Sequence, residues 1–165
     1  MEFVRVTIDQ PGEIARLSAF ATAVNREYYG PLLGEAQTEY HVEKFQSVRA
    51  ITEQIRRGFA YFILENEGEL LGFFAYFPWN EALYLSKFYM AKQHRGKGWG
   101  KASIAFLGQR AKELGLNAIE LNVNRFNPTV AIYEHMGFVR VREEKIDIGA
   151  GFFMDDYVYR LELGK

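Results

Sequence analysis

The chain has 165 residues, the size of one domain, with 48% hydrophobic and 25% charged residues and no cysteine. The lack of cysteine excludes a disulfide framework, a cysteine nucleophile and a thiolate metal site. A formal net charge of −1 gives no support to nucleic acid as a partner, and no apolar run approaches the ~20 residues that span a bilayer. We therefore expect one cytoplasmic domain over residues 1–165 that binds no nucleic acid, membrane or metal.

The first half of the chain carries the patterns of strands and two helical regions. The segments are a strand at 3–8, a helix at 14–28, a helical region at 34–57 and a hairpin of strands 60–65 and 69–77. Tyr29-Gly30-Pro31 is expected to end the first helix, and the second helical region is expected to break near Ser47. We expect the hairpin turn at Asn66-Glu67-Gly68 and the next turn at Pro78-Trp79-Asn80.

The second half of the chain alternates strands with helices. The segments are strands at 83–90, 119–123, 138–148 and 154–163, a helix at 98–114 and a short helix that starts at Asn127. Asn127 suits the N-cap of the short helix, Pro128 its first position and Gly137 the position just past its end. Gly108 lies inside the longer helix, where glycine lowers helix stability by ~1 kcal/mol relative to alanine. Close packing against a neighbouring element would explain a glycine at this position.

The most informative stretch is 93–101, Gln-His-Arg-Gly-Lys-Gly-Trp-Gly-Lys, between a predicted strand and a predicted helix. Its glycines let a ligand approach the backbone, and the helix N-terminus adds free N–H groups, so the stretch predicts a pyrophosphate site. A P-loop is excluded because Arg95 stands where its first glycine is needed and Ala102 follows the lysine. A dinucleotide fingerprint is excluded because Lys101 stands at the third glycine position.

The stretch resembles the acetyl-CoA loop of the GNAT acetyltransferase superfamily, [QR]-x-x-G-x-[GA], here Gln93-x-x-Gly96-x-Gly98. Residues 85–90 are similar to the family's strand 4, and residues 127–138 resemble its N-x-x-A-x-x-x-Y-[EK]-x-x-G-F segment. Residues 147–157 look like bacterial members related to spermine/spermidine acetyltransferases. The resemblance implies an α/β fold, a mixed and mostly antiparallel sheet of about seven strands with helices on both faces, in the order β-α-α-β-β-β-α-β-α-β-β.

The implied activity is transfer of an acetyl group from acetyl-CoA to a primary amine of a small molecule, polyamine-like or an aminosugar, or of a protein, by direct attack in a ternary complex. Backbone N–H groups of residues 88–90 are implied to hold the developing oxyanion, and Asn127 either touches the cofactor or only caps its helix. The residues that the resemblance places at the cofactor are Phe88, Tyr89, Met90, Arg95, Gly96, Lys97, Gly98, Trp99, Gly100, Lys101 and Asn127.

Tyr133 is the implied catalytic acid for the leaving thiolate. A phenol titrates near ~10, and an aliphatic thiolate is similarly basic, so a tyrosine proton suits the departing sulfur. The family usually places this tyrosine seven positions after the asparagine, whereas here Tyr133 follows Asn127 by six. The alternative is a half-buried core tyrosine.

The acceptor side is less defined. Tyr28 and Tyr29 fall at the junction of the first two helices, which shapes the acceptor pocket in this family, and Glu35 and Glu81 are further candidates for substrate binding. For the general base, candidates are Glu35, Glu39, His41 and Glu81, although the glutamates at 35, 39 and 43 also have the spacing of a solvated helix face. Asp155 and Asp156 either attract a cationic acceptor or face water.

Two alternatives to an N-acetyltransferase stay open. One is a non-catalytic CoA-binding or regulatory module, favoured by the lack of an obvious base and the short step from Asn127 to Tyr133. The other is an acyltransferase with a different acyl donor or acceptor. The resemblance also allows a homodimer.

Overall fold

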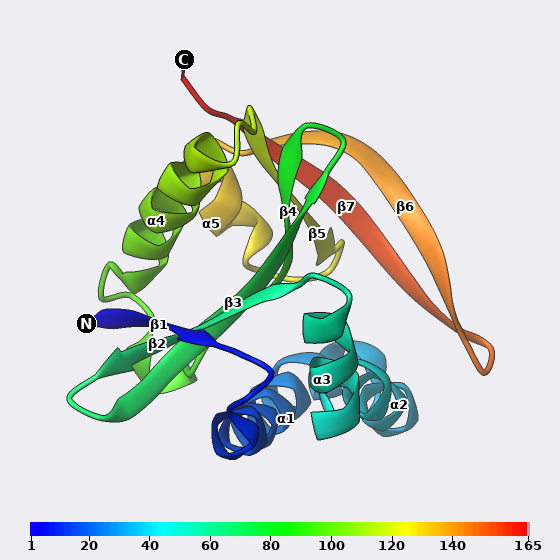
Figure 1. Ribbon diagram of the computed structural model, residues 1–165. Helices are drawn as coiled ribbons and strands as arrows, with labels where there is room; N and C mark the ends of the chain where they lie inside the picture. The colour runs from blue at the N-terminus through cyan, green and yellow to red at the C-terminus, as the bar shows by residue number, and fades with distance from the viewer. Residues whose placement is uncertain (165) are drawn as a thin grey trace. The chain divides into compact units, whose positions relative to one another are not determined.

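The computed structural model describes residues 1–164, and its seven strands follow the order β1-β2-β3-β4-β5-β7-β6 (Figure 1). Strand β2 pairs antiparallel with β1 and β3, strand β7 pairs antiparallel with β5 and β6, and β4 pairs parallel with β5, so the mixed, mostly antiparallel sheet is confirmed. In chain order the elements are β1 (Glu2–Val6), α1 (Pro11–Leu33), α2 (Glu35–Gln46), α3 (Val48–Arg56), β2 (Ala60–Asn66), β3 (Glu69–Trp79), β4 (Ala82–Met90), a 3₁₀ turn (Lys92–His94), α4 (Trp99–Glu113), β5 (Ala118–Asn124), α5 (Val130–His135), β6 (Val139–Gly149) and β7 (Phe152–Glu162).

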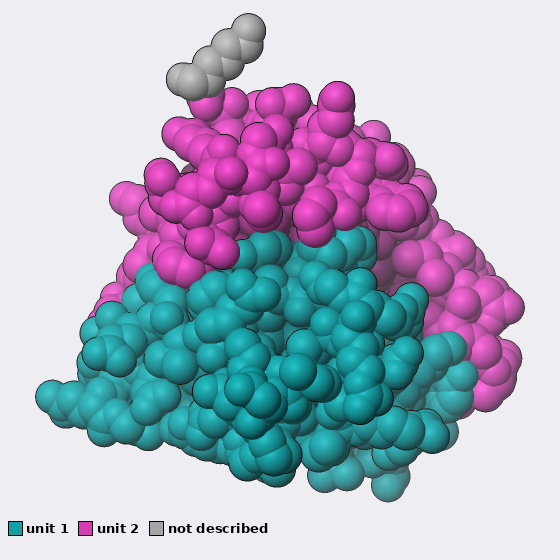
Figure 2. All heavy atoms as spheres, in the orientation of Figure 1, with its two compact units in different colours: residues 1–77, 87–96 teal, residues 78–86, 97–165 magenta. Residues whose placement is uncertain are grey.

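The chain forms two compact units, coloured separately in Figure 2. Unit 1 comprises residues 1–77 and 87–96, and unit 2 comprises residues 78–86 and the chain from residue 97 onwards. Strand β4 therefore gives its first residues to unit 2 and its last four to unit 1. None of the helices in residues 1–164 has the length and apolarity needed to cross a membrane.

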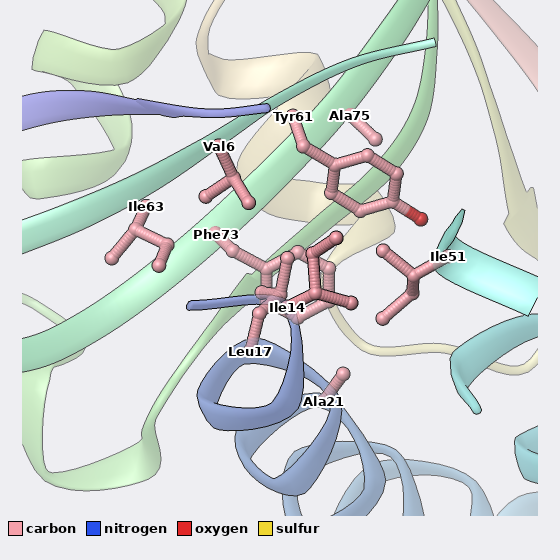
Figure 3. Packing of buried hydrophobic residues seen from close by; sticks show 9 residues of the cluster. All are labelled: Val6, Ile14, Leu17, Ala21, Ile51, Tyr61, Ile63, Phe73 and Ala75. Atoms are coloured by element: carbon pink, nitrogen blue, oxygen red, sulfur yellow. The ribbon is translucent and has the colours of Figure 1, made fainter. Parts of the chain in front are cut away.

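Unit 1 is held together by an apolar cluster between α1 and the strands β1 to β3 (Figure 3). Ile14, Leu17 and Ala21 recur on one side of α1 and are at most 2% exposed, as helical spacing predicts. They pack with Val6, Ile51, Tyr61, Ile63, Phe73 and Ala75. Burial of each large apolar side chain stabilises the fold by roughly 1.5–3 kcal/mol, so this cluster fixes α1 on the hairpin that precedes β4.

The end of α1 differs from expectation. The helix continues through Pro31 to Leu33, so the prediction that Tyr29-Gly30-Pro31 ends it is wrong. Proline near a helix C-terminus removes only one intrahelical N–H, and the N–H of Gly34 still bonds the carbonyl of Gly30 at 3.0 Å. Gly34 ends the helix because its φ of 80° lies in the left-handed region.

Other predicted breaks agree more closely with the structure. The hydroxyl of Ser47 accepts the N–H of Ala50 at 3.1 Å, which caps α3 and confirms the break near Ser47. This break adds one helix to the expected element order. The hairpin turn lies at Glu67-Gly68, with φ of 50° and 82°. The following turn was placed too early, because β3 runs to Trp79 and the positive φ values fall at Asn80-Glu81.

In unit 2, helix α4 buries Ile104, Leu107 and Ala111, which recur on one side of the helix. The short helix α5 begins at Val130, so Asn127 is not its N-cap. The side chain of Asn127 accepts the backbone N–H and the hydroxyl of Thr129, at 2.9 and 2.8 Å. This bond closes a local turn ahead of the helix, which is the other use of asparagine in such a position.

Two glycines that lie within regular elements differ in the space around them. A Cβ at Gly72 would lie 2.5 Å from the carbonyl oxygen of Tyr89 and 2.6 Å from Sδ of Met90, whereas one at Gly108 would meet only Leu163, at 3.6 Å. Close packing therefore requires glycine at Gly72 and not at Gly108. We expect Gly108→Ala to raise the free energy of unfolding by about 1 kcal/mol through helix propensity. We expect Gly72→Ala to lower it by about 1–3 kcal/mol through overpacking.

Urea denaturation of both variants and the parent chain checks this contrast. Because the same methyl group is added in each case, shifts of the same sign would contradict the assignment of space around the two positions.

Candidate active site

The loop after β4 is anchored at its start by side chains of unit 1. The ring nitrogen Nε2 of His94 lies 2.9 Å from Oε1 of Glu69, and His94 is buried. Nε of Arg95 donates to the carbonyl of Met90 at 3.3 Å, and its guanidinium lies over the ring of Tyr28, 5.2 Å from the centroid. These contacts fix the direction in which the chain enters the glycine-rich stretch.

The glycine-rich stretch itself presents backbone. Gly96 and Gly98 have φ of 75° and 83°, conformations that side chains with a Cβ rarely adopt. A Cβ built at Gly96, Gly98 or Gly100 would meet no atom within 4 Å, so a ligand has room to approach. The first bond of α4 joins the N–H of Ala102 to the carbonyl of Gly98 at 3.1 Å, and the N–H groups of residues 99–101 precede it. The predicted cations Lys97 and Lys101 are exposed to solvent beside them.

The predicted cofactor strand, residues 88–90, is half-buried at the end of β4. Earlier in β4, the parallel ladder pairs Ala82–Tyr84 with Ala118–Glu120. Beyond the pair Tyr84–Glu120, Leu85 and Ser86 continue the strand, and β5 continues to Asn124. Strand backbone outside a ladder has N–H and C=O groups that can bind an extended ligand.

An aromatic cluster joins the end of α1 to the end of β4 in unit 1. The hydroxyl groups of Tyr29 and Tyr89 are 3.0 Å apart, and the ring of Tyr28 meets both of their rings edge-on, with centroids 5.6 and 6.1 Å away. The structure thus brings the two predicted acceptor tyrosines together with a predicted cofactor residue. Such rings offer faces that attract an organic cation.

Lys87 is buried in β4, although no sequence motif singled it out. Its Nζ donates to the hydroxyl of Tyr61 at 2.7 Å, to Oε1 of Gln46 at 3.1 Å and to the carbonyl of Phe45, and Tyr61 donates in turn to Gln54. Burial lowers the pKa of the Lys87 ammonium well below its usual range. The alternation of strand residues predicts this burial, because Lys87 shares a strand face with the buried residues Leu83 and Leu85.

The glutamates that the sequence suggested for acceptor binding or for the general base, Glu35, Glu39 and Glu81, are exposed to solvent. Glu35 begins α2 and is exposed, and Glu81 is exposed in the turn before β4. Glu39 forms a two-pronged ion pair with Arg26, at 2.7 and 2.9 Å, which lowers the pKa of its carboxyl. The structure therefore buries none of the three carboxylates.

His41 is buried in α2 between aromatic rings. The centroids of Tyr29 and Phe45 lie 4.8 and 4.9 Å from that of its imidazole, and within residues 1–164 neither ring nitrogen has a hydrogen-bond partner. Burial, and secondly the charge of Lys87, lower the pKa of His41 to about 4. The imidazole is therefore neutral and weakly basic at neutral pH.

Tyr133 lies half-buried on α5, with its ring against the edge of Phe138 at 5.6 Å between centroids. Asn127, three residues before the helix, is buried. The step of six between them is accommodated by the turn at Asn127–Thr129 and the late start of the helix. Residues 1–164 hold no group of three or more His, Asp or Glu side chains arranged as metal ligands.

The family model described as the acetyltransferase (GNAT) family matches residues 21–138. The chain belongs to the GNAT acetyltransferase family. Among curated proteins, this GNAT chain is 32% identical over 99 residues to an uncharacterized N-acetyltransferase, YjgM, of Escherichia coli, and 36% identical over 75 residues to streptothricin acetyltransferase of Streptomyces lavendulae. The aligned parts span 57% and 44% of this chain and 56% and 40% of those relatives.

Solved GNAT structures share the whole fold. The PaiA N-acetyltransferase of Thermoplasma acidophilum, in complex with coenzyme A, has a TM-score of 0.72 at 19% identity and covers 98% of both chains. A GCN5-related N-acetyltransferase of Rhodopseudomonas palustris has a TM-score of 0.80 at 15% identity, over 98% of this chain and 95% of its own. Identities this low establish the fold alone, and the family expected from the loop is confirmed.

Proposed function

We propose that this GNAT chain is an acetyl-CoA-dependent N-acetyltransferase and acts as one functional domain. The observation that carries the proposal is the loop of residues 93–101, where left-handed glycines at 96 and 98 lead into the start of α4. A Cβ at either glycine would meet no atom within 4 Å, and the free N–H groups at the start of α4 lie at the positive end of the helix dipole, which suits a pyrophosphate. The motif spacing and the family match both support coenzyme A as the molecule that carries this pyrophosphate.

The cations of the loop have separate roles in this proposal. Lys97 and Lys101 are exposed and can add charge at the phosphates. Arg95, held over Tyr28, shields the edge of the cofactor site and links it to the aromatic cluster. Asn127 is buried, and its side-chain oxygen accepts two hydrogen bonds from Thr129, so it holds the turn that leads from β5 to α5 beside the cofactor.

The remaining groups complete the reaction. Backbone N–H groups of residues 88–90 hold the thioester carbonyl and then the oxyanion, a contribution whose loss costs about 10²–10³ in rate elsewhere. Tyr133 gives its proton to the sulfur as the C–S bond breaks. The amine attacks the thioester directly, with both substrates bound.

We take a small organic amine as the acceptor that binds at the aromatic cluster. Tyr28, Tyr29 and Tyr89 offer ring faces and hydroxyl groups to a cation. One relative is named streptothricin acetyltransferase, and a solved structure with a TM-score of 0.66 at 18% identity, which covers 98% of this chain and 96% of its own, is a spermidine N-acetyltransferase chimera from Vibrio cholerae and hSSAT. Both names support a small-molecule acceptor of the polyamine or aminosugar type.

Calorimetric titration with acetyl-CoA, followed by free-thiol release over polyamines, aminosugars and peptides with free N-termini, tests the proposal. We expect binding and turnover with at least one small amine. Tyr133→Phe should lower kcat by about 10²-fold or more and keep the affinity for acetyl-CoA within about twofold, because only a proton donor is lost.

Tyr76→Phe is the matched control. Tyr76 of β3 is stacked on Phe62 of β2 and has no part in the proposed chemistry. Binding without turnover on any amine would identify a CoA-binding module instead. Turnover only with longer acyl-CoA donors would identify another acyltransferase.

A further inference from the structure

Two buried polar side chains of unit 1 differ from all the others. Apart from the tyrosines, the buried polar side chains that the structure describes in this unit are hydrogen-bonded with two exceptions, Thr38 and His41 of α2. The hydroxyl of Thr38 and both ring nitrogens of His41 have no partner among the described residues. The side chains that do take part in hydrogen bonds are Ser18, Asn25, Gln46, Gln54, Lys87 and His94.

These unpartnered atoms are concentrated at one place. Thr38 is 2% exposed and His41 is 7% exposed. Because they are three residues apart on α2, their side chains lie on one side of the helix. A buried polar atom loses its hydration and gains nothing in return without a partner, so native proteins contain few such atoms. Three of them within one helical turn indicate a place where a ligand supplies the missing hydrogen bonds.

The two side chains border the aromatic cluster of Tyr28, Tyr29 and Tyr89. The imidazole of His41 lies 4.8 Å from the ring of Tyr29, measured between centroids, and the hydroxyl of Tyr29 is 3.0 Å from that of Tyr89. All of these residues belong to unit 1. In the function proposed above, on which this inference rests, the acceptor amine binds at this cluster. The ligand that reaches α2 is therefore another part of the same acceptor.

The unpartnered groups are uncharged, and they include both donors and acceptors. Burial is the main cause that lowers the pKa of His41 to about 4, so at neutral pH its imidazole has one N–H donor and one lone pair. The hydroxyl of Thr38 also donates one hydrogen bond and accepts others. A hydroxyl group of a ligand matches both side chains, because it too can donate and accept at once.

A second ammonium group does not match this side of α2. An ammonium has donors and no lone pair, so it cannot accept the N–H of His41, and a buried ammonium needs a carboxylate beside it. The carboxylates of α2 are all exposed, namely Glu35, Glu39 and Glu43. Lys87, whose charge acts on His41, is itself an amine and attracts a cation in neither protonation state.

We propose that the acceptor is an amine that carries a hydroxyl group, an aminosugar or an amino alcohol, and that Thr38 and His41 bind this hydroxyl group. The hydroxyl donates to the lone pair of His41 and accepts the hydroxyl proton of Thr38. A second hydroxyl group of an aminosugar accepts the N–H of His41. The two side chains are thus specificity-determining residues, which distinguish hydroxylated amines from polyamines.

A set of matched amines tests the acceptor class. Aminopropanol, propylamine and diaminopropane share one primary amine on a three-carbon chain, and glucosamine is added as the aminosugar. We expect kcat/KM in the thiol-release assay to be at least about 10-fold higher for the better hydroxylated amine than for propylamine or diaminopropane, because the latter two leave buried groups unpaired.

Equal kcat/KM for hydroxylated and plain amines, or a preference for diaminopropane, spermidine or peptides, would overturn this acceptor class and leave the acetyltransferase intact. Absence of turnover by the parent chain on every amine would overturn the proposed function itself, and this inference with it.

Thr38→Val tests the site, since valine keeps the shape of threonine and lacks the hydroxyl. We expect KM for the hydroxylated amine to rise about 10-fold, whereas KM for propylamine and the affinity for acetyl-CoA stay within about twofold. Stability in urea should be no lower than that of the parent, because the hydroxyl that is lost has no partner among the described residues.

Ser18→Ala is the matched control. Ser18 also has a buried hydroxyl in unit 1, but it donates to the carbonyl of Gln46 at 2.7 Å. This variant should lower stability in urea and leave KM unchanged, the opposite of the result expected for Thr38→Val.

His41→Leu is measured beside Thr38→Val and should also raise KM for the hydroxylated amine. A folding defect of one variant is recognised by thermal unfolding and then does not decide the result. Folded variants at both positions that keep the parental KM for the hydroxylated amine would overturn the role of Thr38 and His41, and would mean that these groups bond internal water alone.

Discussion

Gly98→Ala is expected to weaken acetyl-CoA binding by about 10–100-fold. Gly98 has φ of 83°, so a Cβ there is strained, and the methyl group would project into the open space beside the start of α4. If the pyrophosphate occupies that space, the loss of one charge-assisted hydrogen bond to a backbone N–H, worth about 1.5–3 kcal/mol, accounts for the change. Calorimetric titration of acetyl-CoA into the parent and the variant measures it.

Gly115→Ala separates strain from ligand contact. Gly115 lies in the turn after α4 with φ of 73°, and a Cβ there also meets no atom within 4 Å. Both variants should lose about 1–2 kcal/mol of folding stability from the left-handed backbone, and only Gly98→Ala should lose affinity for the cofactor. Equal affinities in the two variants would place the cofactor away from this loop.

The elements that the sequence predicted well are those with local causes. The turn at Glu67-Gly68, the cap at Ser47 and the glycine-rich loop each depend on a few adjacent residues whose backbone preferences are strong. The end of α1 was missed for the opposite reason. Pro31 alone predicts a stop, but Pro31, Leu32 and Leu33 remain helical because the bond from Gly34 to Gly30 closes the last turn.

The chemical side chains depend on register, which a single sequence does not reveal. Asp155 and Asp156 are neighbours of the same type, and from the sequence either one could bind a cation or face water. Pairing of β7 with β5 and β6 turns Asp156 inward beside Asn122 and leaves Asp155 at the surface with Arg125. A shift of one residue in this register would exchange their environments, so the burial of Asp156 emerges only from the sheet.

His41→Leu is expected to remove a loss of stability at acid pH. The pKa of His41 is about 4 in the folded chain and near ~6.5 when unfolded, so between these values the unfolded chain binds a proton that the folded chain does not. Stability therefore falls as pH drops from 6.5 to 4, by about 3 kcal/mol for a shift of this size. Leucine does not titrate, and it also removes two buried ring nitrogens that have no partner within residues 1–164.

Asp156 hides this effect in the parent chain, because burial raises the pKa of its carboxyl to about 6 in the folded state. Between pH 6 and its unfolded pKa near ~3.9, the folded chain binds a proton that the unfolded chain does not, so Asp156 adds stability as pH falls. Urea denaturation from pH 7 to 4 in the Asp156→Asn background should thus show the full His41 loss, and adding His41→Leu should remove it. Adding His135→Leu, at an exposed histidine of α5, is the control and should leave the loss in place. An acid loss of the same size after His41→Leu would mean that the imidazole is not its source and that the folded chain does not lower the pKa of His41.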